Sequence, residues 1–114
     1  MTKENLIFIG HIIENINDIE SFMRGVTKES FLKNKEKQNA VIRSLEIIGE
    51  AVKNLPLDIT TKHPNIPWKE IAGTRDKITH HYFGLDLELI WKTIKEDTPK
   101  LKQEILKIRK NLEK

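Results

Sequence analysis

The apolar residues of this chain recur in steps of three and four, the spacing that places side chains on one face of an α-helix. A first helix is predicted from the apolar series Ile9, Ile12, Ile13, Ile16, Ile19, Phe22 and Met23. Gly25 follows this series as a candidate C-terminal stop. A second helix, ended by Pro56, is predicted from the more regular series Val41, Leu45, Ile48, Val52 and Leu55. A stripe this narrow is typical of helix–helix packing, so it predicts a core or a dimer seam and not a ligand site.

The segments around the second helix continue the helical pattern. Residues 28–37 predict a short helical turn or a loop, and residues 57–66 predict a connector with about one helical turn. Pro67 suits the first position of a third helix, because its missing N–H would have no partner there anyway. That helix is predicted to run from about Trp68 to about Tyr82.

Two further helices complete the prediction. Gly84 lies just beyond the end of the third helix, and Asp86 can cap the following one. Thr98 and Pro99 repeat the cap-then-proline arrangement at the start of the last helix. The apolar residues of that helix are Leu101, Ile105, Ile108 and Leu112. Since no stretch alternates with period two for long enough to predict a strand, the expected fold is all-α, a four- to five-helix bundle forming a single domain over residues 1–114.

Composition and charge narrow the class of protein. The 114 residues include no cysteine, which excludes disulfides and thiolate metal sites and fits a reducing cytosol. No apolar run approaches the roughly 18 residues of a membrane span, so we expect a cytoplasmic protein without membrane segment, metal or cofactor. The net charge of +3 gathers in residues 100–114, which hold six Lys or Arg against two Glu. Such a run either tracks nucleic-acid phosphates or, more often, forms a solvated helix face.

One short stretch concentrates the side chains that could carry chemistry. It contains half of the histidines and the only tyrosine of the chain, in the set Arg75, Asp76, His80, His81 and Tyr82. Arginine binds phosphate oxygens in bidentate fashion, and histidine acts as general acid or base near neutral pH. RNA carries its own nucleophile, the 2′-hydroxyl. A histidine that removes its proton and an arginine that stabilises the developing charge are therefore enough for metal-independent cleavage.

On an unbroken helix, a rotation of about 100° per residue decides which of these side chains meet. Asp76 and His80 then lie one turn apart and can hydrogen-bond, which would fix the imidazole tautomer. Arg75 shares a face with Tyr82 but lies about 140° from His80. For both to meet one phosphate, the arginine must wrap around, the helix must distort, or a second protomer must supply one of them. We favour the second protomer, which makes dimerisation part of the mechanism.

A plainer interpretation competes with this one. The Arg-x4-His spacing is common, and Asp76 with His80 could form only a surface helix pair. His11 stands beside apolar neighbours and is expected to be a partly buried structural residue. Trp68 and Trp91 are expected to be core or interface anchors rather than platforms for stacking bases.

The stretch Arg75-x4-His80-x-Tyr82 resembles the R-x4-H-x-Y motif of HepT-like proteins in the HEPN superfamily. The likeness extends, in the family's order, to residues 40–55, 66–75 and 89–94. It implies a helical bundle that dimerises with the motif near the dimer cleft.

The resemblance also implies an activity and a partner. The activity is that of a ribonuclease toxin, with Arg75 and His80 as the catalytic pair. The partner is a minimal nucleotidyltransferase antitoxin, MntA, that transfers AMP from ATP to the motif tyrosine, here Tyr82. A phosphate-bearing adduct beside Arg75 would occupy the anion site and exclude RNA.

Two residues depart from the family's commonest pattern. Asp76 stands where asparagine is usual, which adds negative charge beside an RNA site and either lowers phosphate affinity or favours protonated His80. His81 adds a second imidazole, so the general base is either His80 or His81. Glu46 and Glu50 match family positions on the second helix, where they either shape the cleft or form surface or dimer salt bridges.

Three functions remain open at this level. The leading hypothesis is a ribonuclease toxin that acts as a homodimer and is held in check by its nucleotidyltransferase. The second is a non-catalytic subunit that positions a nucleotide or substrate for such a transferase, with Arg75 holding phosphate. The third is a helical dimerisation module whose motif residues tolerate substitution.

Overall fold

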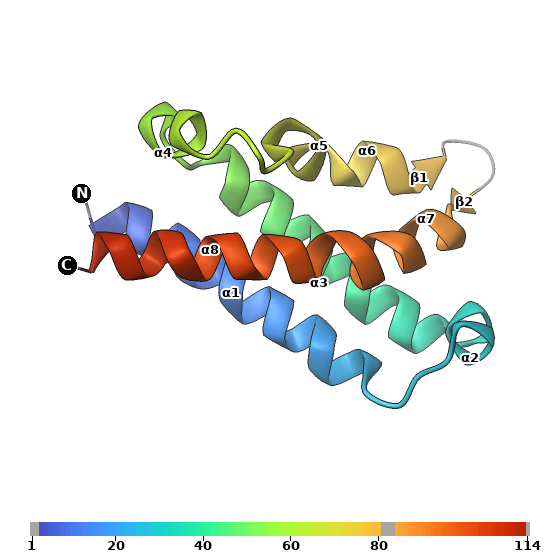
Figure 1. Ribbon diagram of the computed structural model, residues 1–114. Helices are drawn as coiled ribbons and strands as arrows, with labels where there is room; N and C mark the ends of the chain where they lie inside the picture. Colours follow the sequence, from blue (N-terminus) through green and yellow to red (C-terminus); the bar gives the residue numbers. More distant parts are fainter. Residues whose placement is uncertain (1–2, 81–83, 114) are drawn as a thin grey trace.

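Three long helical segments form the body of the molecule in the computed structural model, which describes residues 3–80 and 84–113 (Figure 1). The first is α1 (Lys3–Met23) and the second is α3 (Lys35–Lys53). The third is a continuous rod made of α7 (Leu87–Lys92), the π-helix η1 (Thr93–Asp97) and α8 (Thr98–Leu112). Helix α1 packs on both α3 and α8, so the apolar faces of these three helices are buried against one another.

The core lies where these three segments meet. The stripe expected on α3 is buried from Val41 to Leu55, which confirms it as core. His11, in contrast, is exposed, and the expectation that it is partly buried was wrong. The reason is rotation, since His11 lies about 150° around α1 from the mean direction of the buried Ile9 and Ile16. The largest fully buried side chains are Phe31, Ile9, Ile12, Ile16, Ile19, Ile48, Ile90, Ile105 and Val41.

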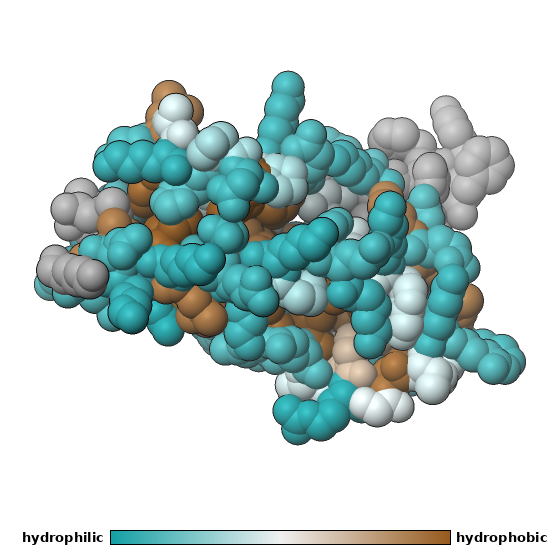
Figure 2. Space-filling model, viewed as in Figure 1, coloured by the Kyte–Doolittle hydropathy of each residue, from teal (hydrophilic) through white to brown (hydrophobic). Residues whose placement is uncertain are grey.

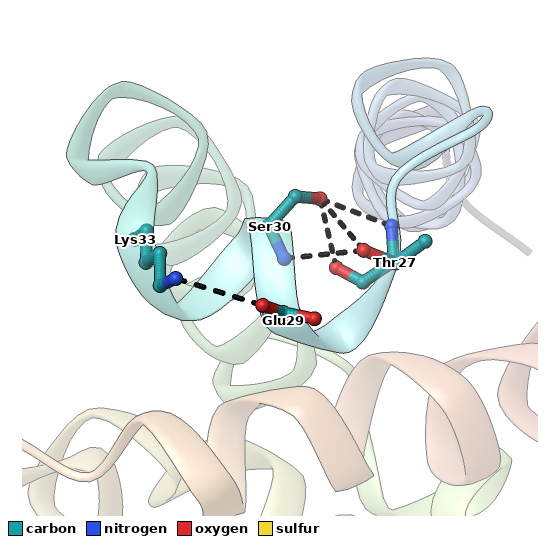
Figure 3. Close-up of polar contacts among 4 residues, drawn as sticks. All are labelled: Thr27, Glu29, Ser30 and Lys33. Carbon is teal, nitrogen blue, oxygen red and sulfur yellow. Dashed lines mark hydrogen bonds and ion pairs between the residues drawn. The ribbon is translucent and has the colours of Figure 1, made fainter.

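Two short helices fill the connections. Helix α2 (Lys28–Lys33) is the short turn expected there, and it begins at a capping box that Figure 3 shows in detail. The Thr27 hydroxyl accepts from the Ser30 N–H at 3.1 Å, and the Ser30 hydroxyl accepts from the Thr27 N–H at 3.1 Å. Helix α4 (Leu57–Lys62) is the expected connector turn.

Both tryptophans anchor neighbouring elements, as expected. The indole N–H of Trp68 donates to the carbonyl of His63 at 3.0 Å, which ties the end of α4 to the next helix. Trp91 lies against the buried ring of Phe31, with the ring centroids 5.7 Å apart. The Lys95 ammonium sits 4.8 Å from the centre of the Trp91 ring, within cation–π range.

The last helix does not begin at a cap as expected. The Thr98 hydroxyl donates to the carbonyl of Ile94 at 3.0 Å, so it bonds back into the preceding turn and caps nothing. Pro99 has no N–H to give to the carbonyl four residues earlier, and its ring crowds that carbonyl. The wide π-turn η1 ends at Asp97, two residues before the proline, and lets the rod continue past it.

The third predicted helix also differs from expectation. It is divided into α5 (Trp68–Ala72) and α6 (Thr74–Ile78), and the chain then extends into β1 (Thr79–His80), which pairs antiparallel with β2 (Gly84–Leu85). Thr79 is β-branched and fits a strand better than a helix end, and Gly84 is a strand partner of His80 rather than a helix stop.

Apart from this two-residue ladder, the elements in the described part of the chain are helical. The all-α helical bundle is therefore confirmed, whereas its dimerisation stays a prediction. None of the helices within residues 3–80 and 84–113 has the length and apolar content needed to cross a bilayer.

Candidate active site

Residues 75–80, the described part of the motif stretch, lie at the end of the bundle opposite the two chain termini (Figure 1). Arg75 and Asp76 belong to α6, and His80 belongs to β1. His81 and Tyr82 fall outside the described residues. Helix α6 packs against α3 and α7, so the beginning of the motif is held by two of the three long segments.

The rotation expected for an unbroken helix does not apply to this stretch. Because α6 ends at Ile78, the spacing of four no longer places Asp76 and His80 one turn apart on a helix face. For the same reason, the angle of about 140° between Arg75 and His80, which holds for an unbroken helix, does not apply here. The face that Arg75 was expected to share with Tyr82 lies outside the described residues. Helix geometry therefore gives no reason to require a second protomer.

Backbone contacts from α5 set the start of α6. The N–H of Gly73 donates to the carbonyl of Lys69 at 3.0 Å, which closes α5. The Thr74 hydroxyl donates to the carbonyl of Ile71 at 2.7 Å, and the N–H of Asp76 donates to the carbonyl of Gly73 at 3.1 Å. The direction of α6 thus follows from the position of α5.

Helix α5 is in turn seated on α3 at Gly49. A Cβ atom at Gly49 would lie 3.1 Å from the carbonyl oxygen of Ile71 and 3.4 Å from that of Ala72. Only glycine allows main-chain atoms of two helices to approach this closely without displacement. Sequence reasoning did not assign Gly49 a role, because its one signal was a glycine within an otherwise good helix-forming segment.

A matched pair of substitutions measures this contact. Gly10 lies in α1, and a Cβ atom there would meet nothing within 4 Å, so Gly10→Ala should raise the free energy of unfolding by about 0.5–1 kcal/mol through helix propensity alone. In Gly49→Ala, the clash of the new methyl group with the carbonyl oxygen of Ile71 should cancel the gain in helix propensity. Gly49→Val should lower the free energy of unfolding by about 1–3 kcal/mol. Urea unfolding of the three variants gives the comparison. Equal gains for both alanine variants would contradict the close contact.

Glu46 and Glu50 line a pocket between α1 and α3 with a volume of about 340 Å³. Glu46 is half-buried and Glu50 is exposed. Ala72, the last residue of α5, forms part of the same wall, so the pocket reaches the segment that leads into α6. The location fits a cleft role for the two glutamates, which remains a proposal.

A second pocket of about 230 Å³ lies behind the motif helix. It is lined by Thr74 and Lys77 of α6, by Leu45 and Ile48 of α3, and by Asp97 of the π-helix. Asp76 is exposed, so the carboxylate next to Arg75 is open to solvent.

The basic residues of the last helix are mostly engaged with carboxylates. Lys102 pairs with Glu20 at 2.5 Å, and Lys107 lies 3.6 Å from Glu104. Figure 2 shows hydrophilic side chains over α8, with hydrophobic residues in the hollow between α8 and the short helices α4 and α5. Surface ion pairs of this kind stabilise the fold by only about 0–1 kcal/mol each. Because these basic side chains already pair with carboxylates, α8 fits a solvated helix face better than a surface for binding nucleic-acid phosphates.

Within residues 3–80 and 84–113, no group of three or more His, Cys, Asp or Glu side chains is close enough to hold a metal ion.

The similarities to known proteins cover most of the chain. A family model described as "Ribonuclease HepT-like" matches residues 12–108. A protein of Methanocaldococcus jannaschii named "Gamma-glutamylcyclotransferase and putative RNase" is 49% identical over 100% of this chain, which spans 51%, about half, of that relative's length. "Probable ribonuclease HepT" of Thermococcus cleftensis is 50% identical over 96% of this chain and 100% of its own length. A further protein of M. jannaschii, named "Putative RNase", is 49% identical over 97% of this chain and 92% of its own length. No solved structure gave a significant match.

Proposed function

The chain belongs to the family of HepT-like ribonucleases, and from this premise we propose that it is a metal-independent endoribonuclease, the toxin of a toxin–antitoxin pair. The observation that carries the proposal is the Arg75-x4-His80 stretch, which begins in α6 and ends in β1 at one end of the bundle. An arginine and a histidine near one phosphate supply the anion stabiliser and the general base for cleavage that uses the 2′-hydroxyl of RNA.

In the proposed reaction, His80 removes the proton of a ribose 2′-hydroxyl, and the 2′-oxygen attacks the adjacent phosphorus. The bond from phosphorus to the 5′-oxygen of the next nucleotide breaks, and that oxygen takes a proton from a second imidazole. The second imidazole is either His81 or His80 of the partner subunit in a homodimer. Arg75 donates hydrogen bonds to the phosphate oxygens, where negative charge grows in the transition state.

This chemistry fixes the ends of the products. One fragment should carry a 2′,3′-cyclic phosphate and the other a 5′-hydroxyl, because no water enters the step. We expect the purified protein, free of its partner, to cut total cellular RNA in excess EDTA and to leave these ends. A denaturing gel shows the cuts, and labelling of 5′-hydroxyl ends by polynucleotide kinase without prior phosphatase treatment checks the chemistry. Cleavage that stops on addition of EDTA would contradict metal independence.

Neutralisation is proposed to occur at Tyr82. A MntA-like nucleotidyltransferase would transfer AMP to the phenol oxygen, and the adduct's phosphate would compete with RNA for Arg75. Tyr82 supports this role by position, since it stands two residues after His80 and is the only tyrosine of the chain. The homodimer and the cytoplasmic location belong to the same proposal.

One observation favours a second candidate function. Asp76 is exposed next to Arg75 in the sequence, so its charge would oppose an approaching RNA phosphate. A non-catalytic subunit that binds a nucleotide for a separate nucleotidyltransferase would tolerate this charge better than a nuclease, because it does not have to stabilise the extra negative charge that grows on the phosphate during cleavage. Expression without the partner separates the two functions, because a toxin should stop growth and a binding subunit should be harmless.

A further inference from the structure

The pocket between α1 and α3 gathers side chains that the proposed cleavage step does not use. Phe8 and His11 of α1 line one side, and Arg43, Glu50 and Lys53 of α3 line the other. Its volume of about 340 Å³ lies at the lower end of the roughly 300–1,000 Å³ range of small-ligand sites. A pocket of this size is large enough for one nucleotide unit.

The charged groups of the pocket are available to a ligand. Considering only the part of the chain that the structure describes, His11, Arg43, Glu50 and Lys53 take part in no ion pair. All four are exposed. Glu46 differs, since it is half-buried and engaged in an interaction of its own. Glu50 is therefore the carboxylate that is ready to accept hydrogen bonds from a bound molecule.

The residue types together define the chemistry of that molecule. Phe8 is partly buried and packed against the core, so its ring is a fixed apolar surface on which a flat base can stack. Arg43 and Lys53 flank Glu50 on α3 and can contact phosphates on either side of the base. A carboxylate accepts N–H donors from the Watson–Crick edge of a base. Guanine presents two adjacent N–H groups there, which match the two oxygens of one carboxylate.

We propose that this pocket is an RNA subsite that selects a guanine near the cleaved bond, with Glu50 as the specificity-determining residue. The proposal rests on the proposed ribonuclease function and adds the base that is read. Its position supports it, because Ala72 closes the pocket wall and only Gly73 separates α5 from the helix that carries Arg75. The pocket therefore adjoins the segment that leads into the motif helix.

Sequencing of cut sites tests the specificity directly. RNA of mixed sequence is digested with wild type, with Glu50→Gln and with Glu36→Gln, a control at an exposed glutamate in the first turn of α3 outside the pocket. Wild type and Glu36→Gln should show guanine enriched at one position relative to the cut. Glu50→Gln keeps the side-chain size but loses a charged acceptor, and should reduce that enrichment roughly tenfold. Absence of guanine enrichment in wild type, or equal enrichment in Glu50→Gln, overturns the proposal.

A binding measurement separates failure of this inference from failure of the nuclease function. Fluorescence anisotropy with His80→Ala protein uses labelled single-stranded RNA oligomers that differ only at one base, guanine, inosine or adenine. Inosine lacks the 2-amino group, so it removes one of the two N–H donors. Affinity should fall from guanine to inosine to adenine, and the differences should vanish when Glu50→Gln is added. Equal affinity for all three oligomers overturns the proposal whether or not the wild type cuts RNA.

Discussion

Replacing His80 with alanine is expected to slow RNA cleavage by about 10²- to 10⁴-fold, the usual contribution of a positioned general base. The substitution should leave the bundle intact, because His80 lies in the two-residue strand β1 at the end of the molecule, and the core is built by α1, α3 and α8. Initial rates on a defined RNA in EDTA give the effect. Circular dichroism and urea unfolding check the fold.

Arg75→Ala should give a loss of about 10²- to 10³-fold through the missing transition-state donor. Arg75→Lys should restore little of it, since an ammonium cannot hold phosphate oxygens in bidentate fashion. His63→Ala is the matched control, because the contact that His63 makes with Trp68 uses the backbone carbonyl and survives loss of the imidazole. A folded His80→Ala protein that cuts RNA at the wild-type rate would remove His80 from the catalytic pair.

The second large effect is expected for the neutralisation of RNA cleavage by AMP transfer to Tyr82. Incubation with the proposed MntA-like nucleotidyltransferase and ATP should silence the wild-type protein almost completely, whereas Tyr82→Phe should stay active. In the reaction, the Tyr82 phenol oxygen attacks the α-phosphorus of ATP, pyrophosphate leaves, and the phenol proton passes to solvent or to a base. Mass spectrometry of the intact protein should show one or more added adenylyl groups on wild type and none on the variant.

The interpretation of this experiment is simplified by composition. Tyr82 is the only tyrosine, so Tyr82→Phe removes every phenol from the chain. Silencing of the Phe variant together with an added adenylyl group would place the modification on another type of residue. Silencing without any added mass would instead indicate that the partner blocks the site by binding alone.

The long helices could be predicted from sequence because their burial is periodic. The step of three and four from Val41 to Leu55 determines which side of α3 faces the core, and no other element has to be known to see it. The cap at Asp86 was predictable for a similar reason, since its carboxylate accepts from the N–H of Leu89 at 3.0 Å, three residues away. Local chemistry decides both features.

The end of the motif helix was not predictable in this way. Residues 74–80 contain no glycine or proline, and the β-branched Thr79 is only a weak local signal against a helix before His80. The stop at Ile78 depends on pairing of Thr79 and His80 with Leu85 and Gly84, a contact between segments. The start of the last helix was not predictable for a related reason. Thr98 and Pro99 have the sequence of a helix cap, but they lie inside the continuous rod of α7, η1 and α8, where the π-turn accommodates the proline.

Gly49 and the α1–α3 pocket lay beyond sequence reasoning because both depend on the distance between helices. In the sequence, a helical glycine that lies close to two carbonyl oxygens, such as Gly49, cannot be told from one with open space around it, such as Gly10. His11 lies more than thirty residues from Arg43 and Glu50 of α3 in the chain, and only the packing of α1 on α3 brings it to the same pocket.

The seat of α5 on Gly49 also bears on how this protein can vary. Because the contact is made by main-chain oxygens of Ile71 and Ala72, it does not depend on the exposed side chains of α5, such as Lys69 and Glu70. Those positions can change in evolution, or be redesigned in an engineered variant that binds a new partner, without moving the segment that carries Arg75. Gly49 itself has no such latitude, so a redesign of this domain should hold that one position fixed.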